Sequence, residues 1–230
     1  LTRLNQSIAS YKSLASLMQQ PREHKQNFAY MSRENWQGTI EFRDVCFNYP
    51  EQTENGLQNI SFKIESGERV ALVGKVGSGK STVAKLMLGL YQPDSGSILI
   101  DGVDSRQIDS SDLRRNIGTV MQDVWLLTGT VKQNIAIGGN NPTDQEILEA
   151  SQLAGVHEFI SHHPEGYGLR LKERGEGLSG GQKQSITIAR ALVSKPPIIL
   201  MDEPTSAMDL PGERTLIERL KAELINQTII

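Results

Sequence analysis

A glycine-rich stretch at residues 74–81, GKVGSGKS, has the residue types and spacing that bind nucleotide phosphates. It fits the pattern G-x-x-x-x-G-K-S/T, in which glycines let successive backbone N–H groups turn inward around phosphate oxygens. The lysine adds a mobile charge for the β and γ phosphates, and the serine hydroxyl can ligate Mg²⁺. A glycine turn without a ligand is the alternative. Phosphate binding is favoured because an apolar strand, 69–73, precedes the loop and a helix, 81–90, follows it.

Two carboxylates, Asp202 and Glu203, directly follow a short hydrophobic stretch at residues 198–201. In an open parallel sheet, ligands bind at the carboxyl ends of the strands. Asp202 would there hold Mg²⁺ through water, and Glu203 would be the general base, or the orienting group, for a water attacking the γ-phosphate. A solvated strand end is the alternative, and the loop at 74–81 makes it the weaker one.

A second candidate anion site, LSGGQ at residues 178–182, lies directly before a predicted helix, 183–194. A serine and two glycines at a helix N-terminus offer free backbone N–H groups beside the positive end of the helix. One nucleotide does not need two such sites so far apart in the sequence. The pattern therefore suggests that a second chain supplies one of them.

The composition is that of an ordinary globular chain of 230 residues with a net charge of −3. This length fits one large domain, or a domain with a subdomain. Proteins that bind nucleic acid usually carry a basic surplus, so that class is disfavoured. The single cysteine, Cys46, cannot form an internal disulfide, which favours a reducing compartment. The chain contains no run of about 18 apolar residues that would cross a membrane.

Hydrophobic periodicity predicts the elements that must position these motifs. Alternation indicates strands over 40–49, 60–64, 69–73, 97–100, 117–121, 198–201 and 228–230, with one slip near 43–44 that is compatible with a bulge. Helical spacing predicts helices over 81–90, after a capping box at Thr143–Glu146, over 183–194 and over 215–224. Strands that alternate with helices imply a mainly parallel sheet covered on both faces.

The first 20 residues carry apolar side chains three and four positions apart, which predicts an amphipathic helix that Pro21 ends. Residues 1–33 hold five basic residues and one acidic residue, a net charge of +4. Two interpretations stay open. The helix packs on its own domain, or it is a basic connector beside a membrane. Residues 22–38 read as a polar linker.

Taken together, the three motifs resemble the nucleotide-binding domain of ABC transporters, from about residue 36 onward. LSGGQ is among the most specific strings in P-loop proteins. The resemblance implies an α/β fold: a P-loop NTPase core with a mainly parallel sheet flanked by helices, an N-terminal antiparallel β subdomain, and a helical subdomain at about 124–195. Residues 1–35 would be the amphipathic helix and linker from a preceding transmembrane domain, and residues 36–230 the ABC ATP-binding domain.

The resemblance also assigns roles, with ATP and Mg²⁺ as cofactors. Tyr49 matches the aromatic that stacks on adenine, and a core aromatic of an edge strand is its alternative. Gln122 matches the glutamine that touches Mg²⁺ and the attacking water and senses the membrane domain. The nucleotide-binding set is Tyr49, Gly74, Gly77, Ser78, Gly79, Lys80, Ser81, Thr82, Gln122, Ser179, Gly180, Gly181, Gln182, Asp202 and Asp209. The catalytic set is Lys80, Gln122 and Glu203, and the metal set is Ser81, Gln122 and Asp202.

The same resemblance implies a nucleotide-dependent, head-to-tail homodimer. ATP would lie between loop 74–81 of one subunit and residues 179–182 of the other, and the γ-phosphate supplies the contacts that close the dimer. Residues 206–209 match the loop that crosses to the opposite subunit, and residues 172–175 resemble the cross-talk loop of exporters. The further partners implied are a transmembrane domain of the same polypeptide and secretion-system adaptor and outer-membrane proteins, with no nucleic acid, at the cytoplasmic face of the bacterial inner membrane.

Two features depart from the family pattern. The family's switch histidine belongs a few residues after Ile230, and its place is taken by none of the chain's histidines, His24, His157, His162 and His163. We therefore read the C-terminus as truncated and expect this chain to hydrolyse ATP poorly. Leu127 and Gln133 stand where exporters usually have phenylalanine and glutamate, so the surface facing the membrane domain is expected to be distinctive.

The strings ERGEGLSGGQ at 173–182 and PTSAMD at 204–209 resemble bacterial type I secretion ATPases, which export large toxins or adhesins. Drug, lipid and peptide exporters remain as alternatives. A soluble ABC ATPase acting on DNA or ribosomes would need a coiled-coil insertion or a second ATPase domain, and the compact spacing from Gln122 to Ser179 disfavours the coiled-coil form. A binding-only regulatory domain is disfavoured by the intact Lys80, Asp202 and Glu203.

Overall fold

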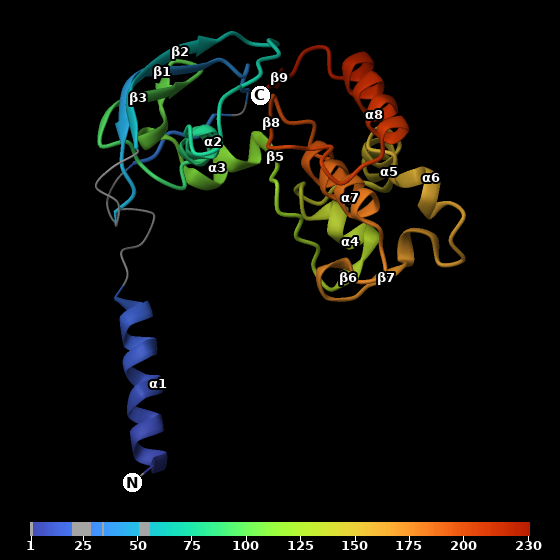
Figure 1. Cartoon of the computed structure of the whole chain (residues 1–230), viewed down its shortest axis with the longest axis horizontal. Coiled ribbons are helices and arrows are strands. Elements are labelled where there is room, and N and C mark those ends of the chain that lie inside the picture. Colours follow the sequence, from blue (N-terminus) through green and yellow to red (C-terminus); the bar gives the residue numbers. More distant parts are fainter. Residues whose placement is uncertain (1, 20–28, 34, 51–55) are drawn as a thin grey trace. The chain divides into compact units, whose positions relative to one another are not determined.

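The computed structural model describes residues 2–19, 29–33, 35–50 and 56–230. It divides into an N-terminal unit, residues 1–30, and a second unit, residues 31–230. The N-terminal unit contains α1 (Thr2–Met18), so the predicted helix is present (Figure 1). Pro21 and residues 22–28 of the predicted linker lie outside the described residues.

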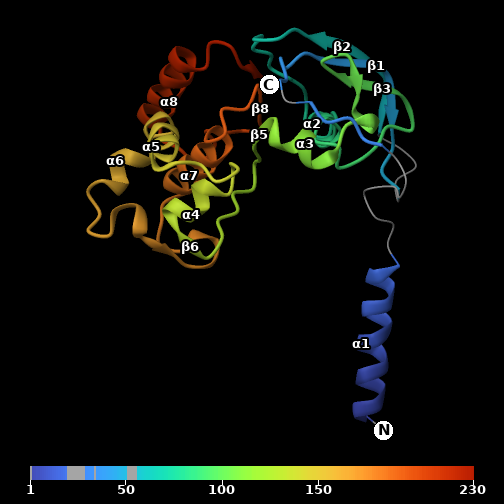
Figure 2. The same cartoon turned by 180° about the vertical axis from the view of Figure 1, so that it is seen from behind.

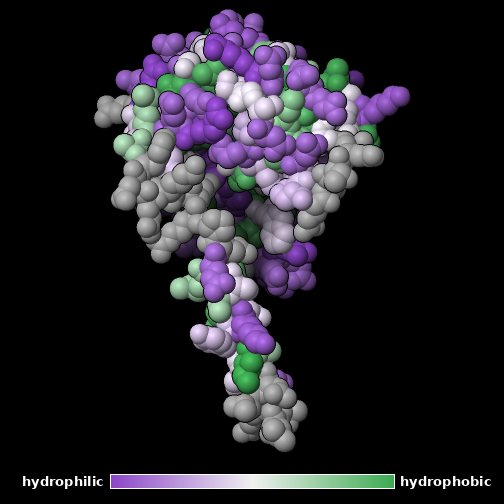
Figure 3. Space-filling view, turned by 90° about the vertical axis from the view of Figure 1, so that its left-hand side faces the viewer, coloured by the Kyte–Doolittle hydropathy of each residue, from purple (hydrophilic) through white to green (hydrophobic). Residues whose placement is uncertain are grey.

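In the part of α1 whose side chains the structure describes, the large apolar side chains are exposed. Tyr11, Leu14, Leu17 and Met18 are all exposed, and Figure 3 shows green hydrophobic and purple hydrophilic residues together on the surface of this helix. Among the described residues, no helix combines the length and hydrophobicity that a membrane span requires.

An antiparallel sheet opens the second unit. Its strand order is β2-β1-β3-β4, formed by β1 (Ile40–Phe47), β2 (Leu57–Ile64), β3 (Ser95–Ile100) and β4 (Val103–Asp104). The predicted bulge is present, because the β1 register shifts between Phe42 and Val45, and Asp44 adopts φ 47°. A Cβ at Gly96 would stand 2.4 Å from the carbonyl oxygens of Arg43 and Asp44, so the bulged strand requires glycine opposite it.

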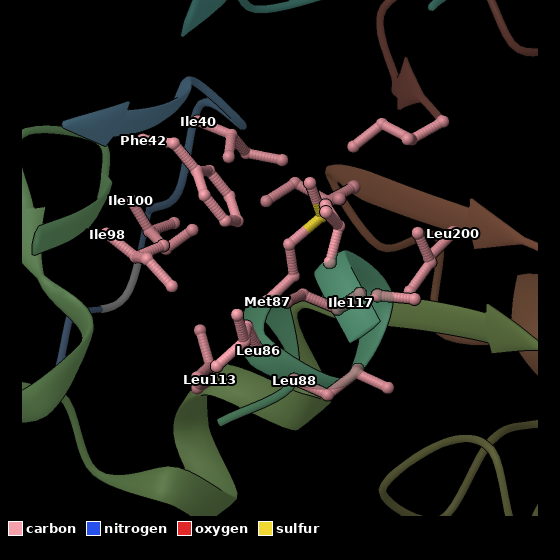
Figure 4. Packing of buried hydrophobic residues seen from close by; sticks show 14 of the residues in the cluster. Ile40, Phe42, Leu86, Met87, Leu88, Ile98, Ile100, Leu113, Ile117 and Leu200 are labelled. Carbon is pink, nitrogen blue, oxygen red and sulfur yellow. The ribbon is translucent and has the colours of Figure 1, made fainter. Parts of the chain in front are cut away.

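One hydrophobic core fixes the helix that follows the glycine-rich loop. Figure 4 shows Ile40, Phe42, Ile98 and Ile100 of the antiparallel sheet near Leu86 and Met87, beside a short helix, α3 (Ser110–Arg115). Leu86 and Met87 belong to α2 (Lys80–Met87) and are each 1% exposed. Because interiors pack densely, this core holds the first turn of α2 in place.

A parallel sheet carries the predicted acidic pair. Its order is β5-β8-β9, from β5 (Ile117–Val120), β8 (Ile198–Met201) and β9 (Thr228–Ile229). Side chains alternate across a strand, so the two faces of β8 pack against different cores. Ile198 and Leu200 belong to the first core, whereas Ile199 and Met201 face a second one.

The strand predicted over 69–73 is present only at its first position. Arg69 bridges Ile229 in parallel, and the Val70 N–H donates to the Ile229 carbonyl at 2.8 Å. Beyond that point the backbone has no ladder partner, and Val73 is 89% exposed. A strand needs a neighbour for each of its hydrogen bonds, and β9 offers this segment a single pairing position.

The second core gathers side chains from the helical region between β5 and β8 and from α8 (Leu210–Glu223), and Figure 2 shows these helices grouped together. The region between β5 and β8 contains α4 (Val131–Ala136), α5 (Asp144–Leu153), α6 (Val156–Ile160) and α7 (Gly180–Leu192), with the short pair β6 (Gly129–Thr130) and β7 (Arg170–Leu171). The predicted capping box is formed, with Thr143 as the N-cap of α5 and Glu146 as its reciprocal partner. Ile186 and Ile188 of α7 are fully buried here.

The last helix begins earlier than predicted. Residues 215–224 were the expected span, whereas α8 runs Leu210–Glu223. Asp209 caps it by accepting the Gly212 N–H at 3.2 Å, and Pro211 lies in the first turn, where its missing N–H costs nothing. The pair Pro211–Gly212, which is typical of a loop, therefore lies in the first turn of a capped helix.

Packing of α7 gives a test of the second core. Ile188→Ala should lower the free energy of unfolding by about 2–5 kcal/mol, because Ile188 is fully buried and its truncation leaves a cavity. Urea denaturation followed by circular dichroism measures this loss. Ile217→Ala on α8, where the side chain is 37% exposed, is the matched control and should change stability by less than about 1 kcal/mol. Equal losses in the two variants would contradict the assigned core.

Candidate active site

The glycine-rich loop wraps around its own lysine. Lys80 Nζ donates to the carbonyl oxygens of Gly74 at 2.9 Å and Lys75 at 3.1 Å. Gly79 caps α2 in the left-handed region, at φ 92°. A Cβ at Gly74 would stand 2.5 Å from Ser78 Oγ. The nearby Ser78 hydroxyl leaves little room for a side chain at Gly74, and the left-handed backbone at Gly79 favours glycine. The loop places a cation among backbone groups at the start of a helix, as phosphate binding requires.

The acidic pair lies directly opposite this loop. The Asp202 N–H donates to the Val120 carbonyl at 2.8 Å, which fixes the end of β8 against β5. Asp202 Oδ2 then accepts a hydrogen bond from Ser81 Oγ at 3.1 Å. Two predicted metal ligands, 121 positions apart in the sequence, are thus in contact.

Glu203 and Gln122 also meet. Gln122 Nε2 donates to Glu203 Oε2 at 3.1 Å, so the residues that follow β5 and β8 are joined. Glu203 sits at φ 51°, in the left-handed region, which is costly for a side chain with a Cβ and is typical of functional sites. The structure brings together the predicted catalytic carboxylate and the predicted water-positioning amide.

The donor set fits Mg²⁺. Ser81 and Asp202 bring a hydroxyl and a carboxylate into contact, and Gln122, which bonds the neighbouring Glu203, could add an amide oxygen. Within the described ranges, no group of three or more His, Cys, Asp and Glu gathers into a cage. Mg²⁺ in nucleotide sites is held by one or two carboxylates together with substrate phosphates, so these residues suit that ion.

One residue of this site was missed by the sequence analysis. Gln184 is fully buried in α7, and its Nε2 donates to the Glu203 carbonyl at 3.1 Å. Its Oε1 accepts the Ala207 N–H at 3.2 Å. Gln184 therefore holds the backbone on both sides of the turn after β8. The available signal was its helical register, because Gln184, Ile188 and Ala191 share one apolar stripe on which a polar residue needs a partner.

The LSGGQ motif forms a separate anion-ready surface. Ser179 caps α7, its Oγ accepting the Gln182 N–H at 3.2 Å while Gln182 Oε1 accepts the Ser179 N–H at 2.9 Å. A Cβ at Gly180 would stand 3.1 Å from Ala207 Cβ, so the motif packs closely on the loop before α8. The motif and Ala207–Asp209 line a hollow of about 590 Å³, and none of residues 74–82 lines it.

Tyr49 is a partly buried aromatic beside the start of α2. Its hydroxyl lies 3.2 Å from Thr82 Oγ1, and Lys85 Nζ stands 5.4 Å from the ring centroid. Phe47 and Tyr91 contact it edge-on, with ring centroids 5.0 and 5.2 Å away. The ring packs against the first core and lies beside the start of α2, but Tyr49 follows β1, an inner strand of its sheet, and so is not the edge-strand aromatic of the alternative interpretation.

A glycine-rich phosphate loop that leads into a helix and faces an acidic strand end is typical of P-loop nucleoside triphosphatases. Residues 57–206 match the ABC transporter family, and the chain belongs to this family. Its members are ATPases that bind ATP, which confirms the predicted family, fold class and ATPase activity class.

The chain is similar to the ATP-binding parts of several exporters. It is 43% identical over 219 residues to the "Putative multidrug export ATP-binding/permease protein YgaD" of Bacillus subtilis, covering 95% of this chain and 38% of that protein. It is 40% identical over 221 residues to the "Leukotoxin export ATP-binding protein LtxB" of Aggregatibacter actinomycetemcomitans, covering 96% of this chain and 31% of that protein.

Structure agrees with sequence on this similarity. A solved bacterial Atm1-family ABC exporter with ATP bound superimposes with a TM-score of 0.88 at 36% identity, covering 98% of this chain and 40% of that one. The chain thus spans between 31% and 40% of the length of these relatives.

The loop geometry predicts that ATP binding depends strongly on Lys80. Lys80→Ala should weaken ATP binding by about a hundredfold or more, because Nζ would donate to two phosphates and a hydrogen bond to a charged group contributes roughly 1.5–3 kcal/mol. Titration with a fluorescent ATP analogue measures the affinity. Lys75→Ala, which removes an exposed ammonium from the same loop, is the control and should retain binding within about tenfold. Similar affinities for the two variants would argue against the phosphate-loop assignment.

Proposed function

We propose that this chain is the ATP-binding and hydrolysing domain of an ABC exporter, which drives transport by ATP-dependent, head-to-tail dimerisation. The observation that carries the proposal is the meeting of Ser81, Asp202, Gln122 and Glu203 beside the lysine of the glycine-rich loop. The LSGGQ surface, with none of residues 74–82 in its hollow, supports a second copy as the provider of the other half of the site.

Each residue has a task in hydrolysis. Lys80 leaves its two loop carbonyls to hold the β and γ phosphates, and the N–H groups at the start of α2 point to the same anion. When bound, Mg²⁺ neutralises charge that develops on the phosphates. Glu203 orients the attacking water and receives its proton, and the Gln122 amide keeps that carboxylate aimed at the water.

The second subunit contributes stabilisation of the transferred group. Ser179 and the N–H groups of Gly180 and Gly181 form the N-terminus of α7, which favours negative charge. In a head-to-tail dimer this end faces the γ-phosphate held by the partner's loop. Loss of that phosphate removes the contacts, so ATP closes the dimer and ADP opens it.

The remaining partners follow from the relatives. We infer a transmembrane domain in the same polypeptide, because YgaD is described as an ATP-binding/permease protein. This chain would then lie at the cytoplasmic face of the bacterial inner membrane. The exposed apolar side chains of α1 suit a connector that packs on that domain.

Cargo has two candidates. Type I secretion of a large protein, with adaptor and outer-membrane partners, is favoured by the similarity to LtxB and to other leukotoxin translocation proteins. Drug export is favoured by the similarity to YgaD, which is as close. The gene sequence upstream of this segment would distinguish the two cargo classes. A globular domain encoded before the apolar spans would favour protein secretion, and apolar spans alone would favour drug export.

Glu203→Gln tests the proposed dimer and the proposed base together. Hydrolysis should fall by about 10²–10⁴-fold, as for loss of a general base, while ATP binding persists. A dimer should then accumulate with Mg-ATP in light scattering.

The matched control is Glu218→Gln on the exposed face of α8, which should hydrolyse ATP like the parent and show no trapped dimer. A strictly monomeric Glu203→Gln variant with Mg-ATP would count against the sandwich.

A further inference from the structure

Three aromatic side chains contact one another beside α2. The ring centroids of Phe47 and Tyr49 lie 5.0 Å apart, those of Phe47 and Tyr91 5.4 Å, and those of Tyr49 and Tyr91 5.2 Å. The planes of Tyr49 and Tyr91 meet at 86°, an edge-to-face contact that aromatic pairs favour. Phe47 is 3% exposed and Tyr91 is 36% exposed. Phe47 thus anchors this cluster in the first core, and Tyr91 lies at its surface.

The backbone turn at the end of α2 sets the position of Tyr91. Gly89 adopts φ 64°, and its N–H donates to the Leu86 carbonyl at 3.0 Å. The Leu90 N–H donates to the Lys85 carbonyl at 3.0 Å. These two bonds, with a left-handed glycine between them, form the Schellman motif that ends many helices. The direction in which the chain leaves α2 towards Tyr91 is therefore fixed by the helix itself.

A second set of hydrogen bonds joins the segment after Tyr91 to the end of β1. The Asp94 N–H donates to the Cys46 carbonyl at 2.8 Å, and Asp94 Oδ2 accepts the Asn48 N–H at 2.8 Å. Tyr49 directly follows Asn48 in the chain. The relative position of Tyr49 and Tyr91 is therefore set by backbone contacts as well as by the contact between their rings.

Tyr49 is placed where the base of a bound nucleotide would be expected. Its hydroxyl lies 3.2 Å from Thr82 Oγ1 in the first turn of α2, and Lys85 Nζ stands 5.4 Å from its ring centroid. A nucleotide whose β and γ phosphates lie in the loop 74–81 extends its ribose and base away from that loop. A partly exposed aromatic ring beside the loop can stack on such a base, and one stacked ring strengthens binding by about 5- to 150-fold.

We propose that Tyr91 is a positioning residue that holds the Tyr49 ring in the orientation in which it stacks on the base of ATP. The proposal rests on the proposed function, because it needs a nucleotide whose phosphates lie in the loop 74–81. The hydrogen bond to Thr82 fixes the Tyr49 ring at one atom only, and the contact with Tyr91 restricts its rotation. A ring held in its binding orientation loses less freedom when the base arrives.

One helix would then set both ends of the nucleotide site. Lys80 begins α2, and Tyr91 follows the turn that ends it. The distance between the phosphate loop and the base-stacking ring is therefore fixed by the length of α2. Removal of the Tyr91 ring should weaken the binding of a ligand that has a base and leave the binding of phosphates alone unchanged.

Calorimetric titration with two ligands tests this expectation. One ligand is a non-hydrolysable ATP analogue, and the other is inorganic tripolyphosphate, which has the phosphates and no base. Tyr91→Leu should weaken binding of the analogue by about two- to tenfold, as expected for loss of an aromatic pair. Its affinity for tripolyphosphate should stay equal to that of the parent. A chain that is merely destabilised would lose affinity for both ligands.

Two controls separate the ring of Tyr91 from its surroundings. Tyr91→Phe keeps the ring and should bind both ligands like the parent. Leu90→Ala removes the neighbouring side chain, which is 50% exposed, and should also bind both ligands like the parent. If Tyr91→Leu does not fold, Tyr91→Met removes the ring with a smaller loss of apolar volume and should give the same split between the ligands.

A double-mutant cycle tests whether Tyr91 acts through Tyr49. Tyr49→Ala should weaken binding of the analogue and leave that of tripolyphosphate unchanged. Adding Tyr91→Leu to Tyr49→Ala should cause no further loss, because residues that act through one contact are not additive.

The outcomes distinguish the positioning role from the proposed function. Parent affinity for the analogue in Tyr91→Leu, an equal loss for tripolyphosphate, or a full further loss in the Tyr49→Ala background would each overturn the role of Tyr91. Parent affinity in Tyr49→Ala would overturn the stacking role of Tyr49, and the role of Tyr91 with it, while the phosphate loop stands. A parent chain that binds neither ligand would overturn the proposed function.

Discussion

The hydrogen bond between Ser81 and Asp202 is the contact on which the site depends, because its two ends belong to different cores. Ser81 is held by α2, which packs on the antiparallel sheet, and Asp202 ends a strand of the parallel sheet. β8 makes the two cores one structure, since Ile198 and Leu200 face the first core and Ile199 faces the second. A strand that alternates between two cores cannot slip by one residue without exchanging both faces, so Asp202 is fixed in register.

The strained backbone of Glu203, directly after β8, is stabilised by hydrogen bonds from α7. Glu203 occupies the left-handed region, and such a residue persists only where its surroundings hold it there. Gln184 supplies that hold by bonding the Glu203 carbonyl and the Ala207 N–H from within α7. The helix that begins at Ser179 thus also supports the backbone of Glu203. A movement of α7 would therefore reach the LSGGQ motif and Glu203 together.

The sequence predicts the parts of this site whose chemistry is local. The loop at 74–81, the bulge near Asp44 and the cap at Thr143 follow from short-range backbone rules, and each is present. Gln184 was not found, because its role lies in what it touches after folding. It is a polar residue on a helix whose apolar stripe predicted only packing. The strand at 69–73 fails for a related reason, since its hydrogen bonds depend on a partner strand that local sequence does not describe.

The position of the LSGGQ motif supports the proposed sharing of the site between two copies of the chain. Gly180 and Gly181 lack side chains and lie against Ala207. The N-terminus of α7 therefore faces the hollow on one side and packs against the loop before α8 on the other. A helix N-terminus attracts an anion only within its first turn, and the glycine-rich loop of the same chain contributes nothing to this hollow. The charge of the helix end is therefore available to a phosphate held by another copy. Asp209 caps α8 directly behind the motif, so the surface that would meet this phosphate is preorganised. A preorganised surface can favour a γ-phosphate when it is present, and this would distinguish ATP from ADP.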